Sequence, residues 1–510
     1  MRTYKERETG DLSTMGVAHR SVRQTTRLRQ IFVVSVLCLA IYCFLVVPEK
    51  NLKEEPKRAL PQELLNNRFL TEDQCRARFP GLLAEVDNEV AKGPFTLQRN
   101  PYNLGPLIAR IRDGQLYILS AGRKADLSKD MLAHRAATLH QIANALLTWP
   151  QPSPSSASPY SHIPDTIIAF NHNDDPAAST FSYSRPADPA YLQNPDGTHR
   201  RIFAIPHFSF YAWSVPFIGS LNRAAKAIKE IESIIPFNQK YPRAIWRGTT
   251  WFNNPRAGRL RQNLVRAFGG ETAPPWADVE ALDWDRGNGE RNATNALPIE
   301  DFCRYKYLIY TEGVTYSGRL QFHNLCASVV LSPPIAWAQP HTHLLRPVFS
   351  YTLDPDAADA VPARGRYGWL RLPSWRGAGG AEKAPGLRRE PIDFGRSAQT
   401  LDAYPAPWVG NAWPVEHDVS EANVVFVAPD WSDLEATVAW LEAHPRIAEG
   451  IAARQRALFD GGGYFSPAAE MCYWRGLIRG WSEVVRVEDG AFDDLEEMSW
   501  EEFSLKEIHK

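Results

Sequence analysis

The chain has 510 residues, of which 44% are hydrophobic and 23% are charged, as in a globular protein. This length exceeds what one hydrophobic core usually organises, so we expect two domains with additional segments. The net charge of −1 argues against a general nucleic-acid binder, because such proteins carry a strongly basic surface.

The amino-terminal region predicts a membrane anchor. Residues 31–47 (IFVVSVLCLAIYCFLVV) form an apolar run that is just long enough to cross a bilayer as a helix. Cations outnumber carboxylates in residues 1–30, so we expect this tail to lie in the cytosol. A cleaved signal peptide is the alternative, but the region before the run is long and no small-x-small cleavage site follows it. Residues 48–95 are charged and contain proline, which favours a stem.

Six cysteines are present, and Cys38 and Cys43 lie within the apolar run. The other four are Cys75, Cys303, Cys326 and Cys472. An even number in an oxidising compartment predicts two disulfides with three possible pairings, and four buried thiols are the alternative. No C-x-x-C pair is present, so a structural zinc site is not expected. The sequon at Asn292 predicts a glycan if this part of the chain is lumenal.

Residues 96–238 predict a first α/β domain. Residues 116–119 and 166–170 have the composition of strands, and apolar residues at helical spacing predict a helix over 130–147. The second strand leads directly into Asn171-His172-Asn173-Asp174-Asp175-Pro176. Open α/β sheets bind ligands at the carboxyl ends of their strands, so these carboxylates are candidate site residues. An Asx turn before proline is the structural alternative, and His172 is a candidate proton carrier.

Residues 201–221 are rich in aromatic residues and proline. Phe210, Tyr211 and Trp213 are candidates to stack on a sugar or peptide, although core packing is the alternative for most of them. Ser220 is placed to cap a helix over 221–235, and we expect the domain boundary near residue 238.

The second predicted domain, residues 239–480, contains a candidate phosphate site. Residues 305–310 predict a strand, Gly313 a turn, and Ser317 and Arg319 the start of a helix that leads to a strand over 327–331. The backbone N–H groups, hydroxyl and guanidinium of such a helix start suit a diphosphate. A surface arginine beside an ordinary turn is the alternative, because the pattern is not G-x-G-x-x-G.

Other segments complete this domain. Residues 244–246 predict a strand followed by a turn, and a helix is expected to begin within residues 253–259. Asp283-Trp284-Asp285 matches the D-x-D pattern of metal sites, but its polar loop setting makes us expect no metal there. Residues 354–420 predict an insertion, either a mobile flap or a disordered loop. A strand over 423–427 and helices over 433–444, 446–459 and 470–485 follow, and residues 481–510 include an acidic tail.

The segment YKYLIYTEGVTYSGRLQFHNLCASVVL resembles the signature of glycosyltransferase family 90, which contains fungal capsule-associated xylosyltransferases and animal protein O-glucosyltransferases. The residues that carry its K-Y-x-x-x-x-x-G-x-x-x-S-x-R block are Lys306, Tyr307, Gly313, Ser317 and Arg319. IWRGTT (245–250), NDDP (173–176) and CYWRGLI (472–478) also fit, so the resemblance extends over roughly residues 70–481.

The resemblance implies an α/β fold of the GT-B-like kind, with two Rossmann-like domains facing across a cleft. It implies inverting transfer of xylose or glucose from a UDP-sugar to a hydroxyl of a glycan or glycoprotein. Asp174 is implied as the base, with Asp175 as the neighbouring alternative. Thr249 and either Arg256 or Arg259 are implied to hold the donor diphosphate with Arg319.

The same resemblance implies the disulfide pairs Cys303–Cys326 and Cys75–Cys472. No cofactor is expected, since the UDP-sugar is a substrate, and dependence on a divalent metal stays open. With the bilayer contacted through residues 31–47, we expect a single-pass type II protein of the Golgi or ER membrane with a lumenal catalytic portion. A catalytically silent, glycan-binding Golgi protein is the alternative. The donor sugar, the acceptor and the oligomeric state are not predicted.

Overall fold

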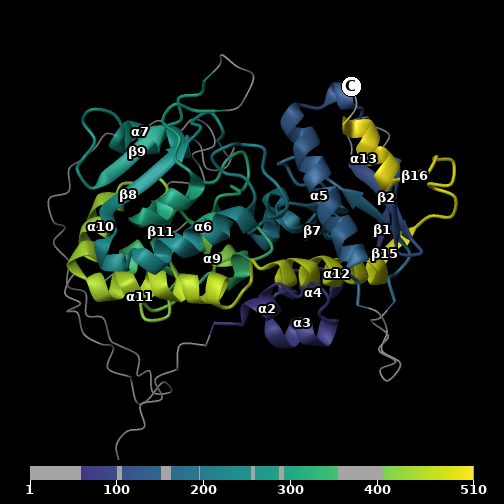
Figure 1. Cartoon of the computed structure of the whole chain (residues 1–510), viewed down its shortest axis with the longest axis horizontal. Helices are drawn as coiled ribbons and strands as arrows, with labels where there is room; N and C mark the ends of the chain where they lie inside the picture. The colour runs from purple at the N-terminus through teal and green to yellow at the C-terminus, as the bar shows by residue number, and fades with distance from the viewer. Residues whose placement is uncertain are drawn as a thin grey trace, which may run out of the picture. The chain divides into compact units, whose positions relative to one another are not determined.

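The structure is a computed structural model that describes residues 59–99, 106–150, 162–194, 196–253, 259–285, 292–353 and 406–508 (Figure 1). Residues 59–510 form one compact unit. The predicted tail and anchor (1–30 and 31–47), Arg256 and residues 354–405 of the predicted insertion lie outside the described residues. None of the helices within the described ranges is long and apolar enough to span a membrane.

A mixed sheet of six strands forms the first half of this unit. Its strands, in spatial order, are β16 (Met498–Ser499), β3 (Gln115–Ser120), β2 (Leu107–Arg112), β4 (Thr166–Phe170), β5 (Thr180–Ser182) and β7 (Ile202–Ala204). The strands β4, β5 and β7 run parallel, whereas β2, β3 and β16 pair in antiparallel fashion. Asp113 and Gly114 both have positive φ in the tight turn from β2 to β3, as a type I′ hairpin requires.

Two long helices cover the mixed sheet. Helix α5 (Lys129–Leu147) begins where the Ser128 side chain accepts a hydrogen bond from the backbone N–H of Met131. Helix α12 (Pro467–Val484) contacts α5 and β4 (Figure 1). Nε1 of Trp481 donates to the Ile167 carbonyl over 2.8 Å, which ties α12 to β4. The strands predicted over 116–119 and 166–170 and the helix predicted over 130–147 are therefore confirmed.

The second half is a parallel sheet. Its strands, in spatial order, are β13 (Pro347–Phe349), β14 (Val424–Phe426), β11 (Val329–Ser332), β10 (Tyr305–Ile309), β8 (Tyr241–Gly248) and β9 (Ala277–Ala281). Its helices are α6 (Leu221–Ile234), α7 (Leu260–Phe268), α8 (Leu320–His323), α10 (Leu434–Ala443) and α11 (Pro445–Arg456). All neighbouring strands are parallel, and β11 is buried throughout, as expected for a sheet covered on both faces.

The strand order of the parallel sheet reverses at β8. The chain passes from β8 to β9 on one side and returns to β10 on the other side of β8. In open α/β sheets a crevice forms outside the carboxyl ends of the strands at such a point. The segments that follow β8 and β10 therefore lie where a ligand would bind.

The two ends of the described chain pack on this unit. Helices α2 (Gln62–Leu65), α3 (Glu72–Arg78) and α4 (Ala84–Val90) contact α12 (Figure 1). Most of the predicted stem between residues 59 and 95 is thus part of the compact unit, because its apolar side chains, such as Phe79 and Leu82, are buried. Strand β1 (Phe95–Leu97) pairs with β15 (Val485–Val487), and the predicted acidic tail forms β16 and α13 (Trp500–Ile508).

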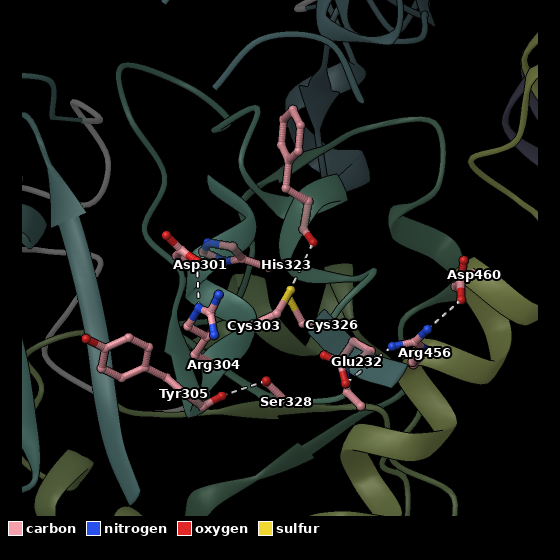
Figure 2. The surroundings of a disulfide bond; sticks show 12 residues. Glu232, Asp301, Cys303, Arg304, Tyr305, His323, Cys326, Ser328, Arg456 and Asp460 are labelled. Carbon is pink, nitrogen blue, oxygen red and sulfur yellow. Dashed lines mark hydrogen bonds and ion pairs between the residues drawn. A yellow bond between two sulfur atoms is a disulfide. The ribbon is translucent and has the colours of Figure 1, made fainter. Parts of the chain in front are cut away.

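Both disulfide pairs implied by the resemblance are present. Cys75 in α3 is bonded to Cys472 in α12, and Cys303 is bonded to Cys326 beside α8. Figure 2 shows the second bond close to Glu232 of α6. The Glu232 carboxylate accepts from Nζ of Lys240 over 2.6 Å and from the backbone N–H of Ala327 over 2.8 Å. The Cys303–Cys326 bond joins the segments that precede β10 and β11, and the Glu232 contacts hold α6 to the segments that precede β8 and β11.

The described unit also contains a short strand pairing and a short helix. Strand β6 (Arg185–Pro186) of the first half pairs in antiparallel fashion with β12 (Trp337–Ala338) of the second. Helix α9 (Pro407–Ala412) lies in the described end of the predicted insertion. The β6–β12 pairing is a direct backbone connection between the two halves.

Candidate active site

A cavity of about 400 Å³ is lined by residues from both halves. Its wall includes residues that follow β4, β8 and β10, together with the first turns of α5 and part of α7. The predicted site residues found at this wall are Asp174, Trp213, Thr249, Gly313, Ser317 and Arg319. The tertiary structure thus brings together groups that are up to 145 positions apart (319 − 174).

Asp174 follows β4 in a turn that Asn171 stabilises. The Asn171 Oδ1 accepts from the Asn173 N–H over 3.3 Å, and its Nδ2 donates to the Asp175 carbonyl over 2.6 Å. Asn171 therefore takes the Asx-turn role that was the structural alternative for the aspartates. The backbone carbonyl of Asp174 accepts from Oγ1 of Thr315 over 2.8 Å, which anchors this turn to the loop after β10.

The Asp174 carboxylate is open to the cavity. The residue is exposed at the cavity wall, and no hydrogen bond to its carboxylate occurs within the described part of the chain. Desolvation by the surrounding protein raises its pKa, the neighbouring charge of Asp175 raises it further, and Arg261 opposes both effects. A carboxylate with a raised pKa is a stronger proton acceptor than an ordinary aspartate.

Arg319 lines the same cavity and lies against the end of β8. Its guanidinium donates to the Arg247 carbonyl and lies 6.0 Å from the ring centre of Trp246. Burial and the charge of Arg261 lower the pKa of Arg319 to about 9, so it stays cationic at neutral pH. Among the described residues Arg319 forms no ion pair with a carboxylate. An anion in the cavity would supply the missing counter-charge.

Arg261 of α7 was not predicted. Its guanidinium is buried and donates to the carbonyls of Glu312 over 2.9 Å and Thr249 over 3.1 Å. These bonds join the segment after β8 to the segment after β10. Burial lowers the pKa of Arg261 to about 10, and it too lacks a carboxylate ion pair within the described ranges.

The sequence feature that could have identified Arg261 as a site residue is the cluster of arginines in NNPRAGRLRQ. We expected Arg256 or Arg259, but Arg256 lies outside the described residues and Arg259 is exposed and does not line the cavity. The helix begins at Leu260, later than predicted, so Arg261 rather than Arg259 is the first-turn arginine that reaches the cavity.

The loop after β10 is held in a fixed shape. The Tyr310 hydroxyl accepts from the Ser317 N–H over 3.0 Å and donates to the Ser317 carbonyl over 3.3 Å. At Gly318 a Cβ atom would clash with His207 and lie 3.0 Å from Cζ3 of Trp213. Only a glycine lets this loop approach the first half so closely. Gly318 is therefore a further site residue that the sequence pattern did not single out.

The three aromatic stacking candidates occupy different environments in the structure. Trp213 lines the cavity, whereas Phe210 is only 5% exposed and packs against Phe465 at 5.9 Å between ring centres. Tyr211 is exposed and stacks on His140, and it does not line the cavity. Of the three stacking candidates, Trp213 therefore lies at the cavity wall, whereas Phe210 belongs to the core and Tyr211 to the surface.

Trp284 is an aromatic wall residue that the sequence placed in a weak D-x-D match. Its Nε1 donates to Oγ1 of Thr249 over 3.2 Å, and its ring centre lies 5.9 Å from that of Phe217. Asp283 instead accepts from Oγ1 of Thr294 over 2.9 Å. The tryptophan of this triplet, and neither aspartate, lines the cavity.

A metal site needs several histidine, cysteine or carboxylate ligands close together. Among the described residues the one cluster of three such groups is Glu232 with Cys303 and Cys326, whose sulfur atoms are bonded to each other. Thiols in a disulfide are not available as ligands.

The predicted glycosylation site, Asn292, is exposed on the short segment that pairs with Trp284.

Comparison with known protein families finds a match over this region. The family model for glycosyl transferase family 90 matches residues 157–360. The predicted resemblance to glycosyltransferase family 90 is confirmed. The family 90 match contains the turn with Asp174, the strand β8 and the loop with Arg319. It supports a glycosyltransferase, which uses a sugar donor and an acceptor. No curated protein matches the chain.

Proposed function

We propose that the chain is a membrane-anchored, inverting glycosyltransferase that transfers xylose or glucose from a UDP-sugar to a hydroxyl of a glycan or glycoprotein. The observation that carries the proposal is the composition of one cavity. A free carboxylate, Asp174, meets two arginines, Arg261 and Arg319, that lack carboxylate ion pairs among the described residues. We read the two parts of the unit as a GT-B-like pair of lobes around this cavity.

In the proposed reaction Asp174 takes the proton of the acceptor hydroxyl. The resulting alkoxide-like oxygen attacks the anomeric carbon of the donor, the new C–O bond forms, and the bond to the diphosphate breaks on the opposite face. A single displacement of this kind inverts the anomeric centre and needs one carboxylate base. The raised pKa of Asp174 supports this role, because it increases the driving force for proton transfer.

The leaving UDP develops charge on its diphosphate. Arg261 and Arg319 are held by backbone carbonyls at the crevice of the parallel sheet, so they need no rearrangement to meet that charge. The Thr249 hydroxyl accepts from Trp284 and keeps its own proton for a phosphate oxygen. We assign donor binding to this side of the cavity, and we propose that no cofactor is required.

Two observations support a lumenal location for the catalytic portion. Disulfides persist in oxidising compartments, and the chain contains the pairs Cys75–Cys472 and Cys303–Cys326. The apolar residues 31–47 are the proposed anchor in a Golgi or ER membrane. Removal of glycan from Asn292 by an endoglycosidase, detected as a shift in mass that Asn292→Gln abolishes, would test this location.

A donor panel tests the proposed reaction. The detergent-solubilised full chain is incubated with several nucleotide sugars, with and without EDTA, and UDP release by slow hydrolysis is measured. We expect release from UDP-xylose or UDP-glucose and little from GDP- or CMP-sugars. Absence of hydrolysis of every UDP-sugar would contradict the proposal, and loss of hydrolysis in EDTA would contradict its metal-independent form.

A further inference from the structure

One part of the cavity wall is not used by the donor or by the base. It consists of the first turns of α5, with Ser128, Asp130, Met131 and His134, together with His172. These residues belong to the half of the unit that carries Asp174, and the arginines belong to the other half. An acceptor must reach Asp174 from a side that the donor leaves open, so this wall is the acceptor end.

His172 is the anomalous residue at this end. It is 3% exposed, and neither ring nitrogen has a hydrogen-bond partner in the described part of the chain, although the residue lines the cavity. By contrast, the buried His207 at the same wall accepts from the Ser209 N–H through Nδ1 over 3.2 Å. A buried polar group without a partner is costly, and a ligand in the cavity would give the ring of His172 the partner that it lacks among the described residues.

The chemistry of the ring indicates the kind of partner. Burial, together with the nearby charge of Arg135, lowers the pKa of His172 to about 4, so the ring is neutral at physiological pH. A neutral imidazole offers one N–H donor and one acceptor nitrogen. A hydroxyl has the same two capacities, whereas a carboxylate or phosphate would accept only. The ring therefore complements a neutral, hydroxyl-bearing acceptor.

We propose that His172 determines acceptor specificity: its imidazole hydrogen-bonds a hydroxyl of an acceptor sugar next to the hydroxyl that Asp174 deprotonates. The proposal rests on the proposed function. His172 and Asp174 lie in the same turn after β4, and both line the cavity. Because Thr315 anchors the Asp174 carbonyl, a sugar held by His172 is held relative to the base as well. His172 thus binds the acceptor, and it does not exchange a proton in the reaction.

The test measures how the enzyme divides the donor sugar between water and an added acceptor. Methyl glycosides of several hexoses serve as acceptor probes, and glycoside product and total UDP are quantified together. The variants are His172→Phe, which removes both nitrogens, His172→Leu as a second apolar replacement, and His172→Gln, whose amide can donate and accept. The matched control is His323→Phe, because His323 is also buried with two unpartnered ring nitrogens but does not line the cavity.

We expect the ratio of transfer to hydrolysis to fall by at least about tenfold in His172→Phe and His172→Leu, as for loss of one hydrogen bond that specifies a hydroxyl. UDP affinity should stay close to wild type and hydrolysis should fall less than transfer, His172→Gln should recover part of the ratio, and His323→Phe should leave the ratio unchanged. A glycoside that lacks the contacted hydroxyl should lose transfer with the wild type but not with His172→Phe.

Three outcomes would overturn the inference while leaving the proposed function intact. These are an unchanged ratio in both apolar variants, an equal loss of transfer and hydrolysis that matches His323→Phe, and hydrolysis by the wild type without transfer to any methyl glycoside. A wild-type chain that hydrolyses no UDP-sugar contradicts the proposed function itself, and that result is obtained before any variant is made.

Discussion

Asp174 combines accessibility with partial desolvation. Its carboxylate faces the cavity without a hydrogen-bond partner among the described residues, and its pKa is raised mainly by the surrounding protein. The Asn171 side chain forms the hydrogen bonds that stabilise the turn, so the Asp174 side chain is not needed for them. At the residue scale the site depends on Asn171 forming the hydrogen bonds of the turn, which leaves the Asp174 carboxylate open to the cavity.

Asp174→Asn should abolish transfer and donor hydrolysis, because an amide cannot accept the proton of the attacking hydroxyl. Affinity for UDP should be unchanged, since the proposed diphosphate contacts lie on the other half. Turnover measured by UDP release and affinity measured by calorimetry check the two parts. Asp175→Asn is the control and should retain most of the activity. Full turnover by Asp174→Asn would remove this residue from the mechanism.

The pH dependence of kcat/KM should report the raised pKa of Asp174. The ionised form is the active base, so activity is present above this pKa and is lost as the pH falls through it. The limb should therefore lie above the range of an ordinary aspartate. In Asp175→Asn the limb should move to lower pH, because the like charge that raises the pKa of Asp174 has been removed. A limb that does not move in this variant would argue against Asp174 as the titrating group.

Arg319→Ala should weaken UDP affinity by at least about tenfold, which corresponds to about 1.4 kcal/mol. The reason is the loss of a cation that has no carboxylate ion pair among the described residues and faces the cavity. Arg259→Ala is the matched control, because Arg259 is exposed beside the same site and does not line the cavity. Calorimetry with UDP distinguishes them. Equal affinities for the two variants would count against the diphosphate role of Arg319.

At the scale of elements, the loop after β10 couples the two halves. Oγ1 of Thr315 holds the Asp174 turn, and Gly318 lies in close contact with His207 and Trp213. The same loop carries Arg319, so base and cation are positioned by one short segment. The reversal of strand order at β8 places this segment beside Thr249 and Arg261.

Gly318→Ala should impair this coupling. The added methyl group would meet the rings of His207 and Trp213, and overpacking of this kind typically costs about 1–3 kcal/mol. We expect a lower melting temperature and a fall in kcat, measured by circular dichroism and UDP release. Gly410→Ala in α9 is the control, since no atom lies within 4 Å of the added Cβ. Wild-type kcat and stability for Gly318→Ala would show that the loop tolerates a shift there.

At the scale of the whole described unit, the Cys75–Cys472 bond joins segments 397 positions apart. It fixes α3 to α12, which in turn packs on α5 and β4. The proposed donor-side residues Thr249, Arg261 and Arg319 lie on segments and helices of the half that contains the parallel sheet. The bond therefore acts on stability, whereas the cavity chemistry depends on the crevice of the parallel sheet.

The double replacement Cys75→Ser with Cys472→Ser should lower the free energy of unfolding by about 2–5 kcal/mol. Below the lowered melting temperature, UDP affinity should stay within about twofold of wild type, a change of less than about 0.5 kcal/mol. Chemical denaturation and calorimetry measure the two quantities. Cys303→Ser with Cys326→Ser provides the comparison, because that bond braces β10 and should also affect UDP binding. A loss of UDP affinity equal in both pairs would contradict this separation.

The amino-acid sequence by itself determined the local elements and the resemblance to glycosyltransferase family 90. Strands such as β4 and β10 are short apolar runs bounded by turn residues, and α5 repeats apolar residues at helical spacing. The local pattern of apolar residues therefore identifies these elements. The ends were less certain, because capping and tertiary contacts set them, as the late start of α7 illustrates. The order of the motifs around Asp174 and Arg319 identified the family that the match over residues 157–360 confirms.

Only the tertiary structure decided which side chains meet at the cavity. Arg261, Trp284 and His172 have no distinctive spacing in the chain, and their positions follow from the strand order of the parallel sheet and from the packing of the two halves. Phe210 and Tyr211 share a motif with Trp213, yet one is buried in the core and the other is on the surface. A sequence records local periodicity, whereas a site between sheets depends on contacts between residues that are far apart in the chain, and these contacts exist only in the folded protein.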